Sequence, residues 1–199
     1  VTVFFLARVQ VSFYFMNNIA DETIFNRARR QVLINAVPFV VLFLIFVGVT
    51  LTADGYELNP VNGEVFVRKY KYFFNLIEMP WVAVMFLIGV VSVLYAIIRA
   101  AFSKTWICGI WYSGIGTVLV VLSLFFLVGY NNTPYYPSAV DLQSSLTIYN
   151  SSSSLFTLEV MTVVSFLVPF VLAYIVYAWR AMDKKPITEQ EMESGEHTY

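Results

Sequence analysis

Long apolar runs constrain the fold of this chain more than any other feature. Four of them, at 32–53, 80–98, 106–128 and 158–179, each hold close to the ~20 residues that an α-helix needs to cross ~30 Å of hydrocarbon. Transmembrane β-strands would instead alternate polar and apolar residues over ~10 positions, and these runs do not. The sequence therefore predicts an all-α fold, a polytopic bundle of transmembrane helices.

A fifth apolar run, 1–16, begins at Val1 without a polar flank, and we interpret it as a truncated membrane segment. A signal peptide is the alternative, but it requires a basic start and a small-residue cleavage site, and this run has neither. We expect about five membrane segments in one domain over 1–182, in a chain that is the C-terminal part of a longer polypeptide. Residues 183–199 predict a charged tail.

Composition excludes an ordinary soluble domain. Hydrophobic residues make up 59% of the chain and charged residues 13%, against about 45–50% and about 25% in soluble proteins. The net charge of −1 and the scatter of basic residues over the loops exclude a nucleic-acid partner. Cys108 is the single cysteine, so an internal disulfide is excluded as well.

Basic residues predict the orientation of the helices. If the loop at 17–31 is cytoplasmic, nine of the twelve lysines and arginines fall on that side, as the positive-inside rule requires. The loop at 131–157, which has no Lys or Arg, is then external, and the tail at 183–199 is cytoplasmic. Aromatic residues mark the predicted borders: Tyr70, Tyr72 and Trp81 outside, and Trp106 and Trp179 inside.

Arg8 lies in the middle of an apolar run, about 12 Å along the helix axis from Met16. Ionisable groups inside a membrane are costly, which makes Arg8 a candidate functional residue. It can snorkel toward the cytoplasm, pair inside the bundle, or pair with a partner subunit. We expect a structural partner for Arg8 and no transport role, because the other four helices hold no deep acidic residue.

Ligands for haem or metal are scarce in the sequence. Haem is commonly held by an axial histidine, and the only histidine is His197, near the end of the tail. Four methionines could reach a haem iron in principle, but methionine in an apolar helix usually packs. We predict no catalytic residue, no metal site and no cofactor on this chain. The methionines are Met16, Met79, Met85 and Met161.

Small residues recur at three- and four-residue spacing along 106–128 and share one face of that helix. Such a face lets helices approach closely in lipid. It serves either packing within the same bundle or contact with another subunit. Its members are Gly109, Ser113, Gly116 or Thr117, Val120 and Ser123.

Two external segments have their own patterns. Residues 54–63 predict successive turns, and the aromatic, basic stretch 68–79 predicts an interfacial segment that anchors the chain or meets a lipid or quinol headgroup. Farther along, Ser154 or Thr157 can cap the last helix, which would put Glu159 in its first turn.

A polar loop runs into the last apolar helix, and the order of its residues is distinctive: Pro137, Ser145, Leu146, Thr147, Asn150, Ser153, Ser154, Thr157, Leu158 and Met161, with Pro169 inside the helix. This order resembles the last external loop and last membrane helix of subunit II of the cytochrome bd-type quinol oxidases. We regard the residues that carry this resemblance as architectural, and we expect Pro169 to bend the helix by removing a backbone hydrogen bond. The resemblance covers essentially the whole chain but only the second half of the family's subunit II.

The resemblance implies a haem-free subunit of a respiratory terminal oxidase in the bacterial inner membrane. In that family the partner, subunit I, holds haem b and haem d, and the complex oxidises quinol and reduces oxygen to water. Subunit I, membrane lipid and quinol are thus the implied partners. The resemblance also allows a structural quinone and a small accessory subunit. The alternative is a cofactor-free transporter or scaffold subunit. Transporters usually show internal repeats, and we find no convincing one here.

Overall fold

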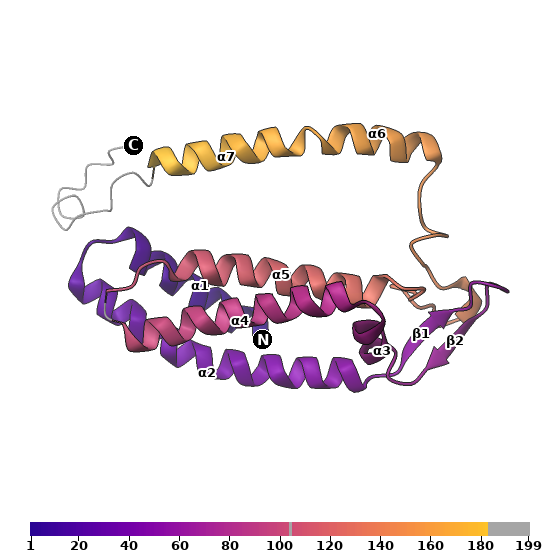
Figure 1. Cartoon of the computed structure of the whole chain (residues 1–199), viewed down its shortest axis with the longest axis horizontal. Helices are drawn as coiled ribbons and strands as arrows, with labels where there is room; N and C mark the ends of the chain where they lie inside the picture. The colour runs from indigo at the N-terminus through magenta and orange to yellow at the C-terminus, as the bar shows by residue number, and fades with distance from the viewer. Residues whose placement is uncertain (104, 183–199) are drawn as a thin grey trace.

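Helices dominate the structure, a computed structural model that describes residues 1–103 and 105–182 (Figure 1). Two antiparallel pairs form a bundle: α1 (Thr2–Asn18) with α2 (Glu22–Thr52), and α4 (Pro80–Phe102) with α5 (Gly109–Gly129). The predicted all-α class is confirmed. The predicted tail at 183–199 lies outside the described residues.

Four helical stretches in the described part of the chain are long and apolar enough to cross a membrane, and they correspond to the four long apolar runs. The predicted first segment, 1–16, is α1, whose 17 residues come close to the ~20 that spanning requires. The four stretches are Glu22–Thr52, Pro80–Phe102, Gly109–Gly129 and Leu155–Met182.

The helix that holds the predicted second membrane segment, 32–53, begins ten residues before that segment. Helix α2 begins at Glu22, because the Asp21 side chain accepts a hydrogen bond from the N–H of Ile24 at 2.6 Å and so caps the first turn. Hydropathy does not detect this extension, because most of its residues are polar. The extension places Arg29 beside the last residues of α4. There the Arg29 Nε donates to the Ala100 carbonyl at 2.7 Å.

The core of the bundle lies where α1, α2 and α4 meet. Phe13 of α1 is fully buried there, and the small side chains of Ala96 and Ala100 on α4 leave room for it. Gly109 at the start of α5 packs directly on the Phe13 ring. Large side chains on α1 thus fit against small ones on its neighbours, as close packing requires.

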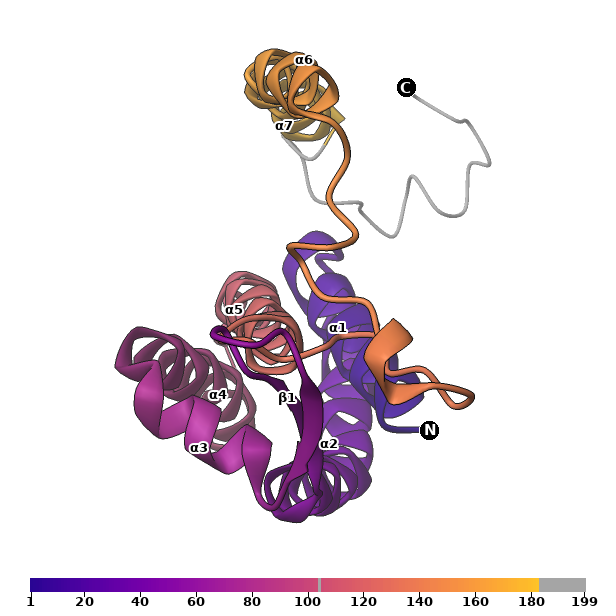
Figure 2. The ribbon, with the colours of Figure 1, turned by 90° about the vertical axis from the view of Figure 1, so that its right-hand side faces the viewer.

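The last membrane segment is interrupted. Helix α6 (Leu155–Ser165) ends at its C-cap Phe166, and α7 (Val168–Met182) begins one residue before Pro169. Because proline has no N–H, the Ser165 carbonyl loses its i+4 donor, and the bend predicted at Pro169 takes this form. Figures 1 and 2 show α6 and α7 lying apart from the bundle, and none of their most apolar stretch is buried.

The end of the bundle opposite the α1–α2 turn holds a hairpin that the prediction of successive turns at 54–63 missed. Strands β1 (Gly55–Leu58) and β2 (Val65–Arg68) pair antiparallel, with Gly55 opposite Arg68 and Leu58 opposite Val65. Each strand has four residues, too few for an alternating pattern to stand out from the turn residues around it. Helix α3 (Lys71–Glu78) follows and packs beneath the hairpin.

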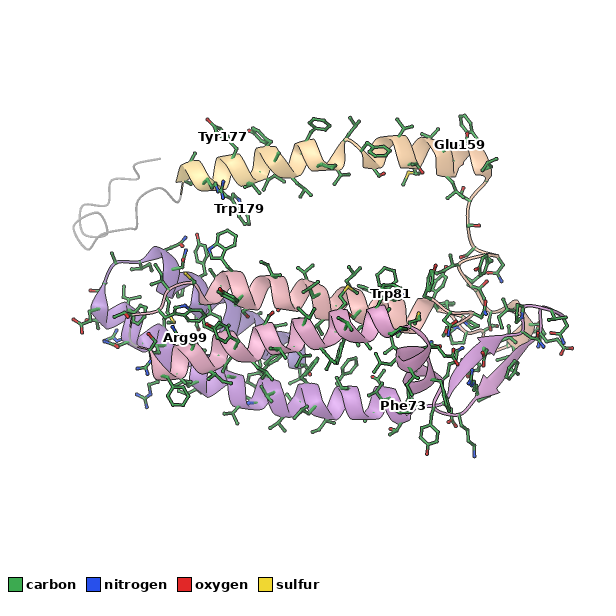
Figure 3. All side chains as sticks on the ribbon, viewed as in Figure 1. Phe73, Trp81, Arg99, Glu159, Tyr177 and Trp179 are labelled. Atoms are coloured by element: carbon green, nitrogen blue, oxygen red, sulfur yellow. The ribbon has the colours of Figure 1, made fainter. Side chains whose placement is uncertain are left out.

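The loops that connect the helices lie at the two ends of the bundle. The α1–α2 turn, the α4–α5 loop and the end of α7 lie at one end, and the hairpin, α3 and the 130–154 loop lie at the other (Figure 1). Figure 3 places Trp81 and Glu159 toward the hairpin end, and Arg99 and Trp179 toward the opposite end. This grouping of the loops is the one that the basic residues predict.

Candidate functional site: an external polar cap and an intramembrane arginine

Charged and amide side chains hold the hairpin end together, and we call its elements the external cap, after the side of the membrane that the basic residues predict for them: β1, β2, α3 and residues 130–154. At its centre, Lys71 is fully buried. The Lys71 Nζ lies 3.1 Å from the Glu57 Oε1 and donates to the Asn131 carbonyl at 3.1 Å. A buried ammonium group is tolerated only when it is paired and hydrogen-bonded, and both conditions hold here.

Glu57 is shared between two cations. Besides Lys71, Arg68 reaches it with one guanidinium nitrogen at 3.1 and 3.0 Å from the two carboxylate oxygens. Arg68 also lies 3.4 Å from Glu78 at the end of α3 and stacks over Phe74, with 4.6 Å between the guanidinium carbon and the ring centroid. These contacts join the hairpin to both ends of α3.

Asn75 fastens α3 to the end of α5. It is fully buried, and its Nδ2 donates to the Leu127 carbonyl at 2.9 Å and to the Thr133 Oγ1 at 2.8 Å. Its Oδ1 accepts from the Asn131 Nδ2 at 3.1 Å. Carbonyls in the last turn of a helix lack intrahelical donors, and Asn75 supplies one for Leu127.

The contacts of Asn75 depend on the turn after α5, where Asn131 (φ 56°) and Asn132 (φ 55°) adopt the left-handed backbone conformation. Asparagine tolerates this backbone region better than most residues, so the chain turns sharply after α5. The Asn132 carbonyl then accepts from the Leu58 N–H at 2.8 Å, which joins the turn to β1.

Sequence reasoning missed that Lys71 and Asn75 face inward. The stretch 68–79 was interpreted as interfacial, which fits Phe73 and Ile77, both exposed. The signal was present in the spacing, since the buried Lys71 and Asn75 lie four residues apart on one face of a helix. Outside the membrane segments, burial raises the pKa of the neighbouring Tyr72 phenol above its usual value, and the nearby Tyr56 adds to this effect.

The structure brings several residues of the predicted motif together in a closed loop. Ser145, nearly fully buried, accepts from the Ser138 N–H at 3.0 Å and donates to the Leu142 carbonyl at 2.6 Å. The Asn150 side chain accepts from the Thr147 N–H at 2.7 Å and donates to the Ser145 carbonyl at 2.9 Å.

The flanks of this loop are joined as well. Tyr136 forms an isolated β-bridge with Leu146, so Pro137 lies between that bridge and the Ser138 bond to Ser145. Gln143, which sequence reasoning missed, donates to the Val65 carbonyl at 3.1 Å and accepts from the Val65 N–H at 2.9 Å. The loop is thereby attached to β2.

The remaining motif residues do not join this loop. Ser154 caps α6, with its hydroxyl 3.0 Å from the Thr157 hydroxyl. Glu159 is the fifth residue of α6, so its predicted place in the first turn is wrong. Four other motif residues lie exposed beside or along α6 and α7: Ser153, Leu158, Met161 and Pro169.

Arg8 lies on α1 against α2. Its Nη2 donates to the Gln31 Oε1 over a long 3.5 Å, and its guanidinium carbon lies 5.7 Å from the centroid of the Phe4 ring. The ion pairs found within the described residues all belong to the external cap, at the other end of the bundle. Arg8 therefore has a polar neighbour but no carboxylate among these residues.

The small-residue face of α5 packs within this bundle, which is the first of the two roles that its sequence allowed. Gly116 meets Gly89 of α4, and Gly109 meets Phe13 of α1. Thr117 accepts from the Gln10 Nε2 of α1 at 3.0 Å. The buried residues of α5 are Gly109, Ser113, Gly116, Val120, Ser123 and Leu127.

Among residues 1–103 and 105–182, no three His, Cys, Asp or Glu side chains gather where they could hold a metal ion. Of the methionines considered as haem ligands, Met16 and Met79 are buried in packing, while Met161 is exposed. The polar groups brought together by the fold thus serve hydrogen bonding between elements, and the arrangement is that of a structural cap.

Comparison with known proteins adds two findings. The sequence model of the family described as "Cytochrome bd terminal oxidase subunit II" matches residues 1–182. A protein of Haemophilus influenzae described as "Probable cytochrome oxidase subunit 2" is 29% identical over 176 residues, which cover 81% of this chain and 44% of the relative. The chain thus spans less than half the length of that relative.

Proposed function

The chain belongs to the cytochrome bd terminal oxidase subunit II family, and from this premise we propose that it is a haem-free membrane part of an oxidase that oxidises quinol and reduces oxygen to water. The observation that carries the proposal is the extent of the family match, since residues 1–182 include all the helices that the structure describes. A shared loop motif alone would support much less.

We propose that the haem-bearing partner, subunit I, supplies haem b, haem d and the electron chemistry. The ligand types on this chain support that division, because the single histidine is His197 in the tail and the methionines of the core are occupied in packing. The role of this chain is then to hold and shield the partner in the membrane.

Quinol chemistry is also assigned to the partner. A cavity of about 400 Å³ lies among α1, α2, α4 and α5. Its walls are aliphatic and aromatic apart from Thr2 and Thr117. Such walls suit an isoprenoid or acyl chain, including the tail of a structural quinone, but they offer few donors for a headgroup that must be deprotonated and oxidised.

The proposed orientation places the external cap outside the bacterial inner membrane and the end of α7 at the cytoplasm. The described arginines at the α7 end support it: Arg27, Arg29, Arg30, Arg99 and Arg180, against Arg68, Lys69 and Lys71 in the cap.

The complex purified in mild detergent through a tag on this chain tests the function. We expect a co-purifying larger subunit, absorption bands of haem b and haem d in the reduced-minus-oxidised spectrum, and oxygen consumption with a quinol donor. A colourless preparation without a partner would contradict the proposal and favour a cofactor-free transporter or scaffold.

A further inference from the structure

A polar notch opens between α1 and α2, and we call it the Arg8 notch: Arg8, Ser12, Gln31 and Asn35. The cavity there has a volume of about 300 Å³, and its other walls are the apolar side chains of α1 beside these residues. It is separate from the external cap, which lies at the opposite end of the helices (Figure 1).

The notch has more hydrogen-bonding capacity than its own residues use. A guanidinium carries five N–H donors, and Arg8 uses one of them, in the long contact to Gln31. Asn35 is 3% exposed, and both of its hydrogen bonds use the Nδ2, to the Gln31 carbonyl at 2.7 Å and the Gln31 Oε1 at 3.2 Å. The site is therefore cationic, and most of its donors are free among the described residues.

Its depth separates this notch from the headgroup region. Arg29 binds the last carbonyls of α4 and marks the level at which that helix ends. Gln31 and Asn35 follow it on α2, roughly 3 and 9 Å deeper at about 1.5 Å per residue. A cation at that depth without a counter-charge is costly.

We propose that the Arg8 notch receives the carboxylate of an aspartate or glutamate carried by a transmembrane helix of the haem-bearing partner subunit. This inference rests on the proposed function and names the contact through which the two subunits meet. A carboxylate accepts two parallel hydrogen bonds from one guanidinium, which would use the free donors of Arg8.

Charge complementarity argues for a carboxylate from outside the described residues. On α2 the acidic residue is Glu22, in the first turn and about 13 Å before Gln31 at 1.5 Å per residue. Glu159 lies toward the opposite end of the molecule (Figure 3). Within the described parts of α1, α4, α5 and α7 there is no Asp or Glu at all.

The shape of the notch argues for a helix as the carrier of that carboxylate. Ala7 and Val11 line its rim on successive turns of α1. Small and short side chains at such spacing allow another helix to approach closely in lipid. A lipid phosphate, in contrast, would lie at the level of the headgroups, above the side chain of Asn35.

A zero-length cross-link tests the contact. In the purified complex carrying Arg8→Lys, a hydrophobic carbodiimide activates the partner carboxylate, the introduced primary amine attacks it, an amide forms and a urea leaves. We expect mass spectrometry to identify a peptide joining residue 8 to an Asp or Glu in a transmembrane segment of the partner. Arg30→Lys, outside the notch, is the matched control and should give no such peptide.

A second measurement tests how strongly this contact holds the two subunits together. Arg8→Gln should lower the fraction of partner retained on size exclusion by on the order of tenfold or more, while Arg30→Gln should leave it unchanged. Full retention of the partner with Arg8→Gln, loss of bound phospholipid in place of the partner, or a cross-link to any acidic residue of the same subunit, the 183–199 tail included, would each overturn the proposal. If the unmodified chain brings down no haem-bearing subunit, the proposed function itself fails, and that result is distinct from these three.

Discussion

Gly89 of α4 and Gly116 of α5 lie against each other so closely that a Cβ added to either would come within 2.8 Å of the carbonyl oxygen of the other. This contact explains why α4 and α5 form the tightest pair of the bundle. In lipid, apolar burial does not drive helices together, so close backbone approach at small residues supplies much of the association. The small-residue spacing on α5 is thus used inside this chain.

The first prediction concerns that contact. Gly116→Ala should lower the free energy of unfolding by about 1–3 kcal/mol, because the added methyl group meets the Gly89 backbone, which cannot rotate away as a side chain can. Gly114→Ala is the matched control on the same helix, since nothing lies within 4 Å of a Cβ there. Thermal unfolding of the purified complex in detergent measures both. Equal melting temperatures for the two variants would contradict the prediction.

The second prediction concerns the buried ion pair of the external cap. Lys71→Met should destabilise the cap by roughly 3 kcal/mol, because it leaves Glu57 partly buried with a single cation, Arg68. Lys69→Met is the control, because Lys69 is exposed and carries the same charge two residues away. Hydrogen exchange of β1 amides measures the effect. The double variant Lys71→Met with Glu57→Gln should recover part of the loss, since the partly buried carboxylate that has lost one of its two cations is then replaced by a neutral amide.

The third prediction separates two motif residues of the same type. Ser145→Ala should destabilise the 136–150 loop by about 1–3 kcal/mol, because the half-buried Ser138 N–H loses its acceptor and the Leu142 carbonyl keeps only the Ser145 N–H of its two donors. Ser153→Ala should have no measurable effect, because that side chain is exposed and makes no hydrogen bond within the described part of the chain. Limited proteolysis of the loop distinguishes them. Equal protection of the two variants would show that the loop does not depend on Ser145.

Hydropathy was enough to locate each long helix, because crossing hydrocarbon demands an apolar run of a definite length. It could not place the start of α2, where Asp21 and a polar turn extend the helix beyond the membrane. Nor could it find the hairpin at 55–68, whose strands of four residues depend on pairing with each other. The buried positions of Lys71 and Asn75 depend on partners from 57, 127, 131 and 133, which only the folded chain brings close.

A comparison of two prolines, Pro38 and Pro169, shows the same limit of reasoning from sequence alone. Pro38 lies inside the continuous helix α2, whereas Pro169 follows a break. Both lack the N–H that an interior helical position supplies. The difference is in the surroundings: near Pro38, Ala36 and Phe39 are buried in the bundle, whereas the residues around Pro169 are exposed. Packing can hold a helix together across a missing hydrogen bond, and the sequence around a proline does not show whether packing will be present.

The last prediction follows from this contrast. Pro169→Ala restores the N–H that can donate to the Ser165 carbonyl, so α6 and α7 should become one continuous helix and the amides of Phe166 and Leu167 should exchange more slowly. Pro80→Ala is the matched control, because Pro80 occupies the first turn of α4, where the missing N–H has no partner to lose. Hydrogen exchange of the complex with mass spectrometric detection measures both variants. If the interruption is instead imposed by a partner that packs on it, the Phe166 and Leu167 amides, which donate to the Val163 and Val164 carbonyls, will exchange as fast in Pro169→Ala as in the unsubstituted protein. Their exchange will then slow only when that partner is removed.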